Sequence, residues 1–218
     1  MQFAPSLVVA AVLSAAAPAF ANTNITLDFE AATSFASVGA LYANQGIDFT
    51  GEALALANDD LGPYFSNANT PGSSEALAGT VMFVNGAEPS ATLNLAAGGG
   101  LQAITGFVGQ VSFDFASSAD AFNLVQVFAG LNGTGQRLAK ISLSENQLDS
   151  ACSSSAFCNW QTVTMSFDGT AQSLVFASNG GAIAYDNISL SAVPEPQTYA
   201  LLLAGLLGLG FMARRTQR

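Results

Sequence analysis

The chain has 218 residues, half of them hydrophobic, with fifteen acidic and five basic side chains and a net charge of −10. This length fits one domain with short appendages, and the hydrophobic fraction is sufficient for a packed core. Between Asn22 and Val193 the only basic residues are Arg137 and Lys140. This excludes nucleic acid and anionic lipid as partners of that segment, because both require Lys and Arg to neutralise phosphate.

The amino-terminal segment has the features of a secretory signal peptide. An apolar run extends from Leu7 to Ala17, and Ala19-Phe20-Ala21 supplies the small-x-small pattern that signal peptidase requires. The pattern departs from the usual signal peptide in lacking Lys or Arg at its start. We expect cleavage between Ala21 and Asn22, so that residues 1–21 are removed on export.

Alternation of apolar and polar residues dominates the body, residues 22–192. In VSFDF (111–115) and QTVTMSF (161–167) the apolar side chains fall on one face and the polar ones on the other, which is typical of half-buried strands. Further predicted strands are ITLDF (25–29), GIDF (46–49), TVMFV (80–84), ATLNL (91–95), NLVQVF (123–128), LAKISL (138–143), SLVFA (173–177) and AIAYDNISL (182–190).

Turn-forming residues separate these strands and fix the fold class. They are Asn85-Gly86, Gly98-Gly99-Gly100, Asn132-Gly133, Asp168-Gly169 and Asn179-Gly180-Gly181. About ten short strands at this spacing, with no amphipathic helix, predict an all-β, antiparallel β-sandwich of jelly-roll type. A β-solenoid is the competing architecture, but the chain has no repeat of fixed period.

Two loops stand out between the strands. Residues 58–79 form the one long stretch without alternation, and long loops of this kind are either functional or mobile. Cys152 and Cys158 are the only cysteines, and an even count in an exported chain predicts a disulfide that fixes the shape of a small loop. Metal binding by these two thiols is the weaker alternative, since the chain has no histidine.

The tail, residues 193–218, has three parts in succession. Pro194-Glu195-Pro196 is followed by an uncharged, Leu-rich span from Thr198 to Ala213 and then by Arg214, Arg215 and Arg218. As a helix the span is about 24 Å long, against a hydrocarbon core of about 30 Å, so it is short for a permanent anchor. The arginines place the tail end in the cytoplasm and the body outside.

This order of parts resembles the PEP-CTERM sorting signal, the carboxy-terminal tag that bacterial exosortases recognise. The resemblance covers about the last 26 residues. It implies a Gram-negative bacterium that makes extracellular polysaccharide, an exosortase as partner, processing near the Pro-Glu-Pro triplet, and release or attachment at the cell surface. The membrane is then a transient stop, with the helix holding the triplet at its surface.

The body begins LDFE and ends YDNISL, and this pairing resembles exported galactose-binding-like jelly rolls. In those folds the first and last strands approach each other, and some carry a structural calcium ion at that edge. The resemblance therefore implies Glu30 and Asp186 as ligands of a structural calcium ion, and the sequence indicates no other cofactor. The plainer alternative is that Asp186 caps a turn or faces water.

Sugar binding is a second possibility for a jelly roll, and it requires aromatic side chains flanked by amides or carboxylates. Trp160, which opens a predicted strand, and Tyr64 are the candidates for glycan contact, although packing in a core is the more common fate of a lone Trp.

Catalysis has few routes in this chain. Without histidine neither a Ser-His-Asp triad nor a His-ligated metal can be built. A carboxylate pair, as in glycoside hydrolysis, is the remaining route, and the adjacent Asp59-Asp60 gives no particular reason for two facing carboxylates. We therefore expect a non-enzymatic, exported structural or binding protein of the polysaccharide matrix. A carbohydrate-binding or adhesive module with a specific ligand is the alternative, and a carboxylate-dependent hydrolase ranks third.

Overall fold

The computed structural model describes most of the body of the chain. The described residues are 22–51, 53–57, 80–84, 91–95, 104–117, 120–146, 157, 159–177, 183–194 and 205.

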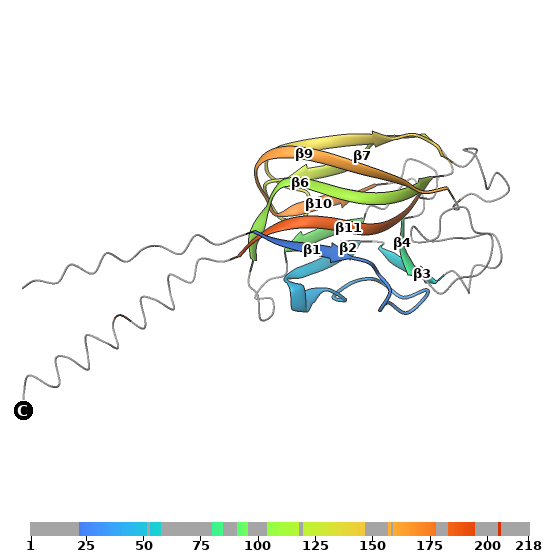
Figure 1. Cartoon of the computed structure of the whole chain (residues 1–218), viewed down its shortest axis with the longest axis horizontal. Helices are drawn as coiled ribbons and strands as arrows, with labels where there is room; N and C mark the ends of the chain where they lie inside the picture. Colours follow the sequence, from blue (N-terminus) through green and yellow to red (C-terminus); the bar gives the residue numbers. More distant parts are fainter. Residues whose placement is uncertain are drawn as a thin grey trace, which may run out of the picture.

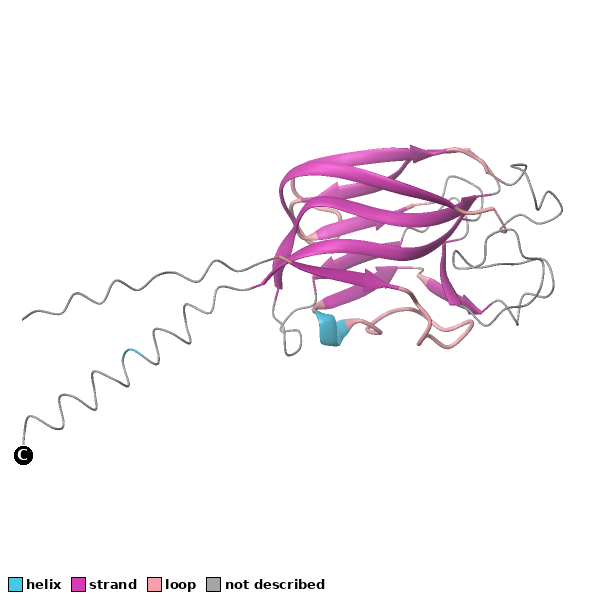
Figure 2. Cartoon of the chain, in the orientation of Figure 1, coloured by secondary structure: helices cyan, strands magenta, loops and turns pink. Residues whose placement is uncertain are grey.

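The described part is built almost wholly from strands, joined by turns and one short 3-10 helix (Figure 2). The strands are β1 (Thr23–Leu27), β2 (Ile47–Gly51), β3 (Leu54–Ala57), β4 (Thr80–Val84), β5 (Ala91–Leu95), β6 (Ile104–Ser117), β7 (Ala121–Phe128), β8 (Arg137–Leu143), β9 (Gln161–Ala171), β10 (Ser173–Phe176) and β11 (Ile183–Pro194), and the 3-10 helix η1 spans Ala43–Gln45.

The strands form two antiparallel sheets that face each other. In the six-stranded sheet the order is β3-β4-β11-β6-β9, and β1 also pairs with β11; in the five-stranded sheet the order is β2-β5-β10-β7-β8. Figure 1 shows β9, β6, β11 and β1 side by side across one face of the molecule. The predicted all-β, antiparallel sandwich is therefore confirmed.

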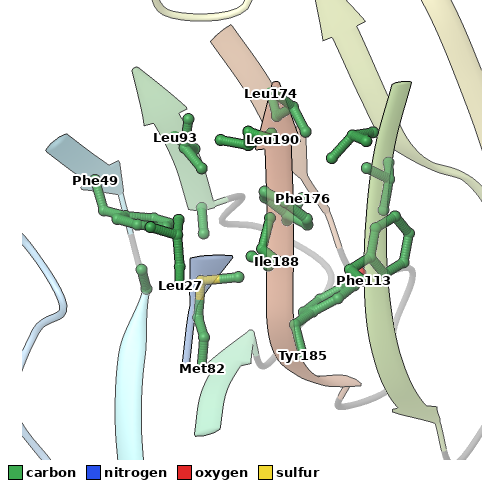
Figure 3. Packing of buried hydrophobic residues seen from close by; sticks show 14 of the residues in the cluster. Leu27, Phe49, Met82, Leu93, Phe113, Leu174, Phe176, Tyr185, Ile188 and Leu190 are labelled. Carbon is green, nitrogen blue, oxygen red and sulfur yellow. The ribbon is translucent and has the colours of Figure 1, made fainter. Parts of the chain in front are cut away.

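The core lies between the sheets and is filled by the apolar members of the alternating strands (Figure 3). Phe113 and Tyr185 come from the six-stranded sheet, and Phe176 comes from the five-stranded sheet. Their rings pack edge to face, with centroids 5.0 Å apart for Phe176 and Tyr185 and 6.1 Å apart for Phe113 and Phe176. Such aromatic pairs stabilise a core by about 1 kcal/mol beyond the area that they bury.

The alternation predicted most strand positions, and β4 and β5 have the expected bounds. Strand β1 ends two residues early, because Phe29 takes a positive φ of 57° that extended strands do not allow. Strand β3 was not predicted, since LALA has no polar alternation. Strand β11 runs four residues farther than predicted, to Pro194.

The turn predicted at Asn132-Gly133 is confirmed: the two residues lie in the β7–β8 connection and have positive φ angles of 54° and 67°. The turn predicted at Asp168-Gly169 is wrong, since both residues lie inside strand β9. There the register passes from Thr170 opposite Val108 to Phe167 opposite Gly109, so the pair forms a bulge in which Gly169 supplies a φ of 92°. A bulge and a turn require the same backbone freedom, so this dipeptide does not distinguish them.

Several predictions concern residues outside the described ranges. These are the loop 58–79, most of the tail and the turns at 85–86, 98–100 and 179–181. Of the predicted helix from Thr198 to Ala213 only Gly205 is described, and it is helical. Within the described ranges, no helix has both the length and the apolar character needed to cross a bilayer.

Candidate functional site

The sorting triplet begins inside the sandwich. Pro194, its first residue, is the last residue of β11 and lies opposite Ile104 of β6. The Thr105 hydroxyl donates a hydrogen bond of 3.3 Å to the carbonyl of Val193. No flexible spacer therefore separates the folded domain from the triplet. Glu195, Pro196 and the three arginines lie outside the described residues.

The amino-terminal end of the body lies beside this junction. Asn22 is exposed, and the next residue, Thr23, is already paired with Ala192 in the antiparallel ladder between β1 and β11. Figure 1 places the start of β1 and the end of β11 together at one end of the sandwich. The predicted signal-peptide junction and the sorting triplet therefore leave the domain from the same edge, whereas Ala19 and Ala21 lie outside the described residues.

An acidic and amide-rich cluster lies where β1 leaves β11. Asp186 is fully buried, with an exposed fraction of 0%, and stands opposite Asp114 of β6. The next residue, Asn187, has a φ of 49° and forms a bulge, because the following register pair is Ser189 and Ser112. The backbone N–H of Asn187 donates to Asp186 Oδ1 at 2.8 Å.

Asp114 holds this bulge from the neighbouring strand. Its Oδ2 accepts a hydrogen bond of 3.0 Å from Asn187 Nδ2, and its Oδ1 accepts one of 2.5 Å from the Thr162 hydroxyl of β9. Charged acceptors make stronger hydrogen bonds than neutral ones, so the carboxylate ties three strands together. The sequence analysis did not single out Asp114; its signal was the lone acidic residue on the polar face of VSFDF.

Tyr42 packs near the end of β1, where its ring meets that of Phe29 edge to face. Its hydroxyl accepts the Phe29 backbone N–H at 2.5 Å and donates to Asp28 Oδ1 at 3.4 Å. Burial raises the pKa of the Tyr42 hydroxyl far above its ordinary value, and the charges of Asp28 and Asp186 raise it further. This tyrosine is therefore neutral and serves as a structural hydrogen-bonding group.

The two predicted calcium ligands have different surroundings. Glu30 is exposed in the turn after β1, whereas Asp186 is buried. Among the described residues, no three Asp, Glu, His or Cys side chains come close enough together to hold a metal ion. Calcium takes six to eight oxygen ligands, which also come from amide side chains, backbone carbonyls and water, so a calcium site at Glu30 and Asp186 would need such ligands as well.

Trp160 lies directly before β9 and is half-buried. It packs, with Leu54, against a second apolar cluster on the six-stranded sheet that consists of Leu56, Ala116, Phe157 and Ala184. The other proposed glycan contact, Tyr64, and the two cysteines, Cys152 and Cys158, lie outside the described residues, as do Asp59 and Asp60.

Comparison with known proteins gives one family match and several structural neighbours. Residues 192–215 match the PEP-CTERM protein-sorting motif. The match confirms the resemblance of the tail to the PEP-CTERM sorting signal. It begins at residue 192, within the last residues of β11. A search of curated proteins finds no match to the chain.

Among solved structures, the K2 cleaved adhesin domain of Lys-gingipain is similar to the chain with a TM-score of 0.50 and 14% identity, covering 78% of this chain and 99% of that one. The K1 cleaved adhesin domain of Lys-gingipain from Porphyromonas gingivalis has a TM-score of 0.46 and 13% identity, covering 78% and 98%. A family 29 carbohydrate binding module from Piromyces equi has a TM-score of 0.38 and 12% identity, covering 68% and 81%.

At these identities the likeness concerns the fold, which is the antiparallel β-sandwich found here. The chain thus joins such a sandwich to a PEP-CTERM sorting motif, which is the organisation of an exported, exosortase-sorted extracellular protein.

Proposed function

We propose that the β-sandwich is a non-enzymatic component of the bacterial cell surface or extracellular matrix, where it binds or scaffolds polysaccharide. The observation that carries this proposal is the continuity of β11 with the sorting motif, because it makes the folded domain the cargo that the motif delivers. The body is strongly acidic and has only two basic side chains, which favours an uncharged partner over nucleic acid or lipid phosphate.

The proposal includes a defined route of maturation. Signal peptidase cuts between Ala21 and Asn22, the span from Thr198 to Ala213 enters the inner membrane transiently, and Arg214, Arg215 and Arg218 stop its transfer. An exosortase then processes the chain near Pro194-Glu195-Pro196. Mass spectrometry of the exported protein tests this route: we expect a mature start at Asn22 and an end near the triplet. An intact Arg218 terminus on released material would contradict it.

A non-enzymatic role is supported by the state of the two facing carboxylates. A hydrolase requires a carboxyl group that reaches the substrate. Asp186 is fully buried, and both oxygens of Asp114 accept hydrogen bonds from neighbouring side chains. We therefore rank a carboxylate-dependent hydrolase below a binding protein.

A carbohydrate-binding or adhesive module with one specific glycan is the alternative to a general matrix role. Trp160 and Tyr64 are its proposed aromatic contacts. Screening the exported protein against an array of matrix polysaccharides distinguishes the two, since a specific module binds one glycan class whereas a general matrix component binds several without preference. Replacing Trp160 with Ala would then reduce binding without loss of export.

Two structural supports complete the proposal. A disulfide between Cys152 and Cys158 would fix the loop before β9, and mass spectrometry with and without reductant tests it. A calcium ion held by Glu30 and Asp186 would need backbone carbonyl oxygens to fill its coordination shell. Thermal melting with and without chelator tests it, and an unchanged midpoint removes these two residues as ligands.

A further inference from the structure

The outward face of the six-stranded sheet carries a row of hydroxyl groups that crosses four strands. Thr164 of β9 lies opposite Ser112 of β6, Ser112 lies opposite Ser189 of β11, and Ser189 lies opposite Thr26 of β1. The two ends of the row are exposed and its centre is half-buried. Adjacent strands are about 4.8 Å apart, so the four hydroxyls are evenly spaced over roughly 14 Å.

A second polar row runs beside the first, one pleat nearer the end from which both chain ends leave. Ser166 of β9 lies opposite Gln110 of β6, and Ser191 of β11 lies opposite Asn24 of β1. Residues two apart on a strand point to the same face and are about 6.8 Å apart. The two rows together place hydroxyls and amides (the polar array) on β9, β6, β11 and β1, which Figure 1 shows as neighbours. The register of β6 against β11 shifts between Leu190 and Ala192, so the second row is interrupted between Gln110 and Ser191.

The polar array contains a groove. Its volume is about 240 Å³, and Val108, Gly109 and Leu190 are among the residues that line it. The other lining residues are polar: Asn22, Asn24, Gln110, Ser112, Ser189 and Ser191. A groove of this size is smaller than most sites for drug-sized ligands and fits a single small polar ring.

The charges around the polar array restrict what it can bind. The four strands that carry it contain no Lys or Arg, and the two basic residues of the body, Arg137 and Lys140, both lie on β8 of the other sheet. The acidic Asp114 lies beside the hydroxyl row, on the same face of β6. An anionic ligand would therefore meet repulsion without compensation, which favours a neutral one.

The composition of the polar array also disfavours a protein partner. The centres of stable protein interfaces are apolar and rich in aromatic residues, whereas the side chains of the two rows are hydroxyls and amides. Asn, Gln, Ser and Thr each donate and accept hydrogen bonds, which matches the adjacent hydroxyl groups of a sugar. This face would therefore hold a sugar by hydrogen bonds alone, without the aromatic stacking that a site at Trp160 would supply. Hydroxyls and amides on four adjacent strands can contact successive units of a repeating ligand.

We propose that the polar array binds a neutral polysaccharide chain across β9, β6, β11 and β1, with one sugar unit in the groove between Asn24 and Gln110. This inference rests on the proposed polysaccharide-binding function and assigns that function to one face. It differs from a site centred on Trp160, which lies beyond Thr162 at the opposite end of the same face.

The test compares two double variants of the full-length chain in detergent, against cellulose, xyloglucan and galactomannan as neutral probes and alginate as the anionic one. Asn24→Ala with Gln110→Ala removes two exposed amides that line the groove. Asn44→Ala with Gln136→Ala removes the same two residue types from exposed positions in η1 and the β7–β8 loop.

We expect the wild type and the control variant to bind a neutral probe equally, and the groove variant to bind about tenfold more weakly, the loss expected for two hydrogen bonds. Equal thermal midpoints establish that both variants are folded. If the wild type binds a neutral probe and the groove variant binds equally well, the assignment to this face is wrong and the proposed function stands. Binding to alginate alone overturns the neutral class, and binding to no probe removes both proposals.

Discussion

Asn187 Nδ2 lies 3.0 Å from Asp114 Oδ2, and this hydrogen bond joins the bulge of β11 to β6. Asn187 holds a left-handed conformation with a φ of 49°, which Asn and Gly adopt more readily than other residues. We predict that Asn187→Gly keeps this backbone and loses the hydrogen bond, at a cost of about 1 kcal/mol in the free energy of unfolding. Asn187→Ala should lose about 1 kcal/mol more, because it adds left-handed strain.

Chemical denaturation of the two variants measures this difference. The Gly and Ala variants lack the same amide, so only the backbone term separates them. An Ala variant as stable as the Gly variant would show that the bulge relaxes when the side chain is lost.

Two glycines of β6 provide a second, internally controlled prediction. A Cβ on Gly106 would lie 2.3 Å from Thr170 Cγ2 and 2.7 Å from the carbonyl oxygen of Ala171. The Ala171 backbone cannot move without disturbing β9, so Gly106→Ala should destabilise the fold by about 3 kcal/mol. Gly109 has a φ of 81° and open space within 4 Å, so Gly109→Ala should cost only about 1 kcal/mol of backbone strain. Equal costs for the two would contradict the close approach of β9 at Gly106.

The buried tyrosines predict how stability depends on alkaline pH. Burial raises the pKa of both Tyr42 and Tyr185 above the ordinary tyrosine value, which is 10.0. The two protonated tyrosines therefore make their full contribution to the free energy of unfolding below pH 10. This contribution is lost as the pH rises, because the hydroxyls of the unfolded chain lose their protons at lower pH than those of the folded chain. We expect the free energy of unfolding to be level from about pH 8 to 9 and to fall above about pH 10.

Tyr-to-Phe variants identify the source of that fall. Tyr42→Phe should be less stable at neutral pH by about 1 to 2 kcal/mol, since the Phe29 N–H loses its buried acceptor, and its alkaline decline should be shallower. Tyr185→Phe should also flatten the decline. Denaturation curves between pH 7 and 11 give both quantities, and a decline that neither substitution changes would mean that other groups cause it.

The junction of β11 with the sorting triplet predicts a dependence of processing on spacing. Pro194 is paired in the sheet, so an exosortase acting near the triplet must reach a peptide bond at the edge of a folded domain. Inserting six Gly and Ser residues between Val193 and Pro194 should therefore speed removal of the tag, measured by pulse-chase labelling in the producing bacterium.

The same six residues inserted after Asn22 form the control, because they lengthen the other connection at this edge and leave the triplet in place. Processing that is equally fast in both insertions, or unchanged by the first, would contradict a steric role for the end of β11.

The sequence predicted the layers of this fold better than their pairing. The alternation in Thr162, Val163, Thr164 and Met165 arises because one face of a strand is exposed to solvent and the other is buried. It depends on a single strand and can therefore be recognised in the sequence. The polar array depends on which strands are neighbours and in which register, and residues such as Ser112 and Ser189 are far apart in sequence. Nothing in either segment alone indicates the other.

The candidate sites show the same contrast between features of one contiguous segment, which the sequence predicts, and features that depend on strand pairing, which it does not. The sorting motif is contiguous, so its residues identified it. Asp114 was overlooked because its significance comes from Asn187 and Thr162, which reach it from two other strands. The assignment of Glu30 and Asp186 as calcium ligands came from a resemblance and stays a prediction, whereas the hydrogen bond between Tyr42 and Asp28 was not predicted. The contacts of Asp114 could not be predicted without the register of β6 against β11 and β9.

Strand β11 holds contacts with β1, β4 and β6, so the six-stranded sheet cannot assemble until this last strand is available. Pairings between such distant segments are expected to form late in folding, because a long loop must close first. The strand that completes the sheet also leads into the sorting motif. A chain that ends before β11 therefore lacks both the central strand of the sheet and the sorting motif. Completion of the fold and sorting of the protein thus depend on the same carboxy-terminal residues.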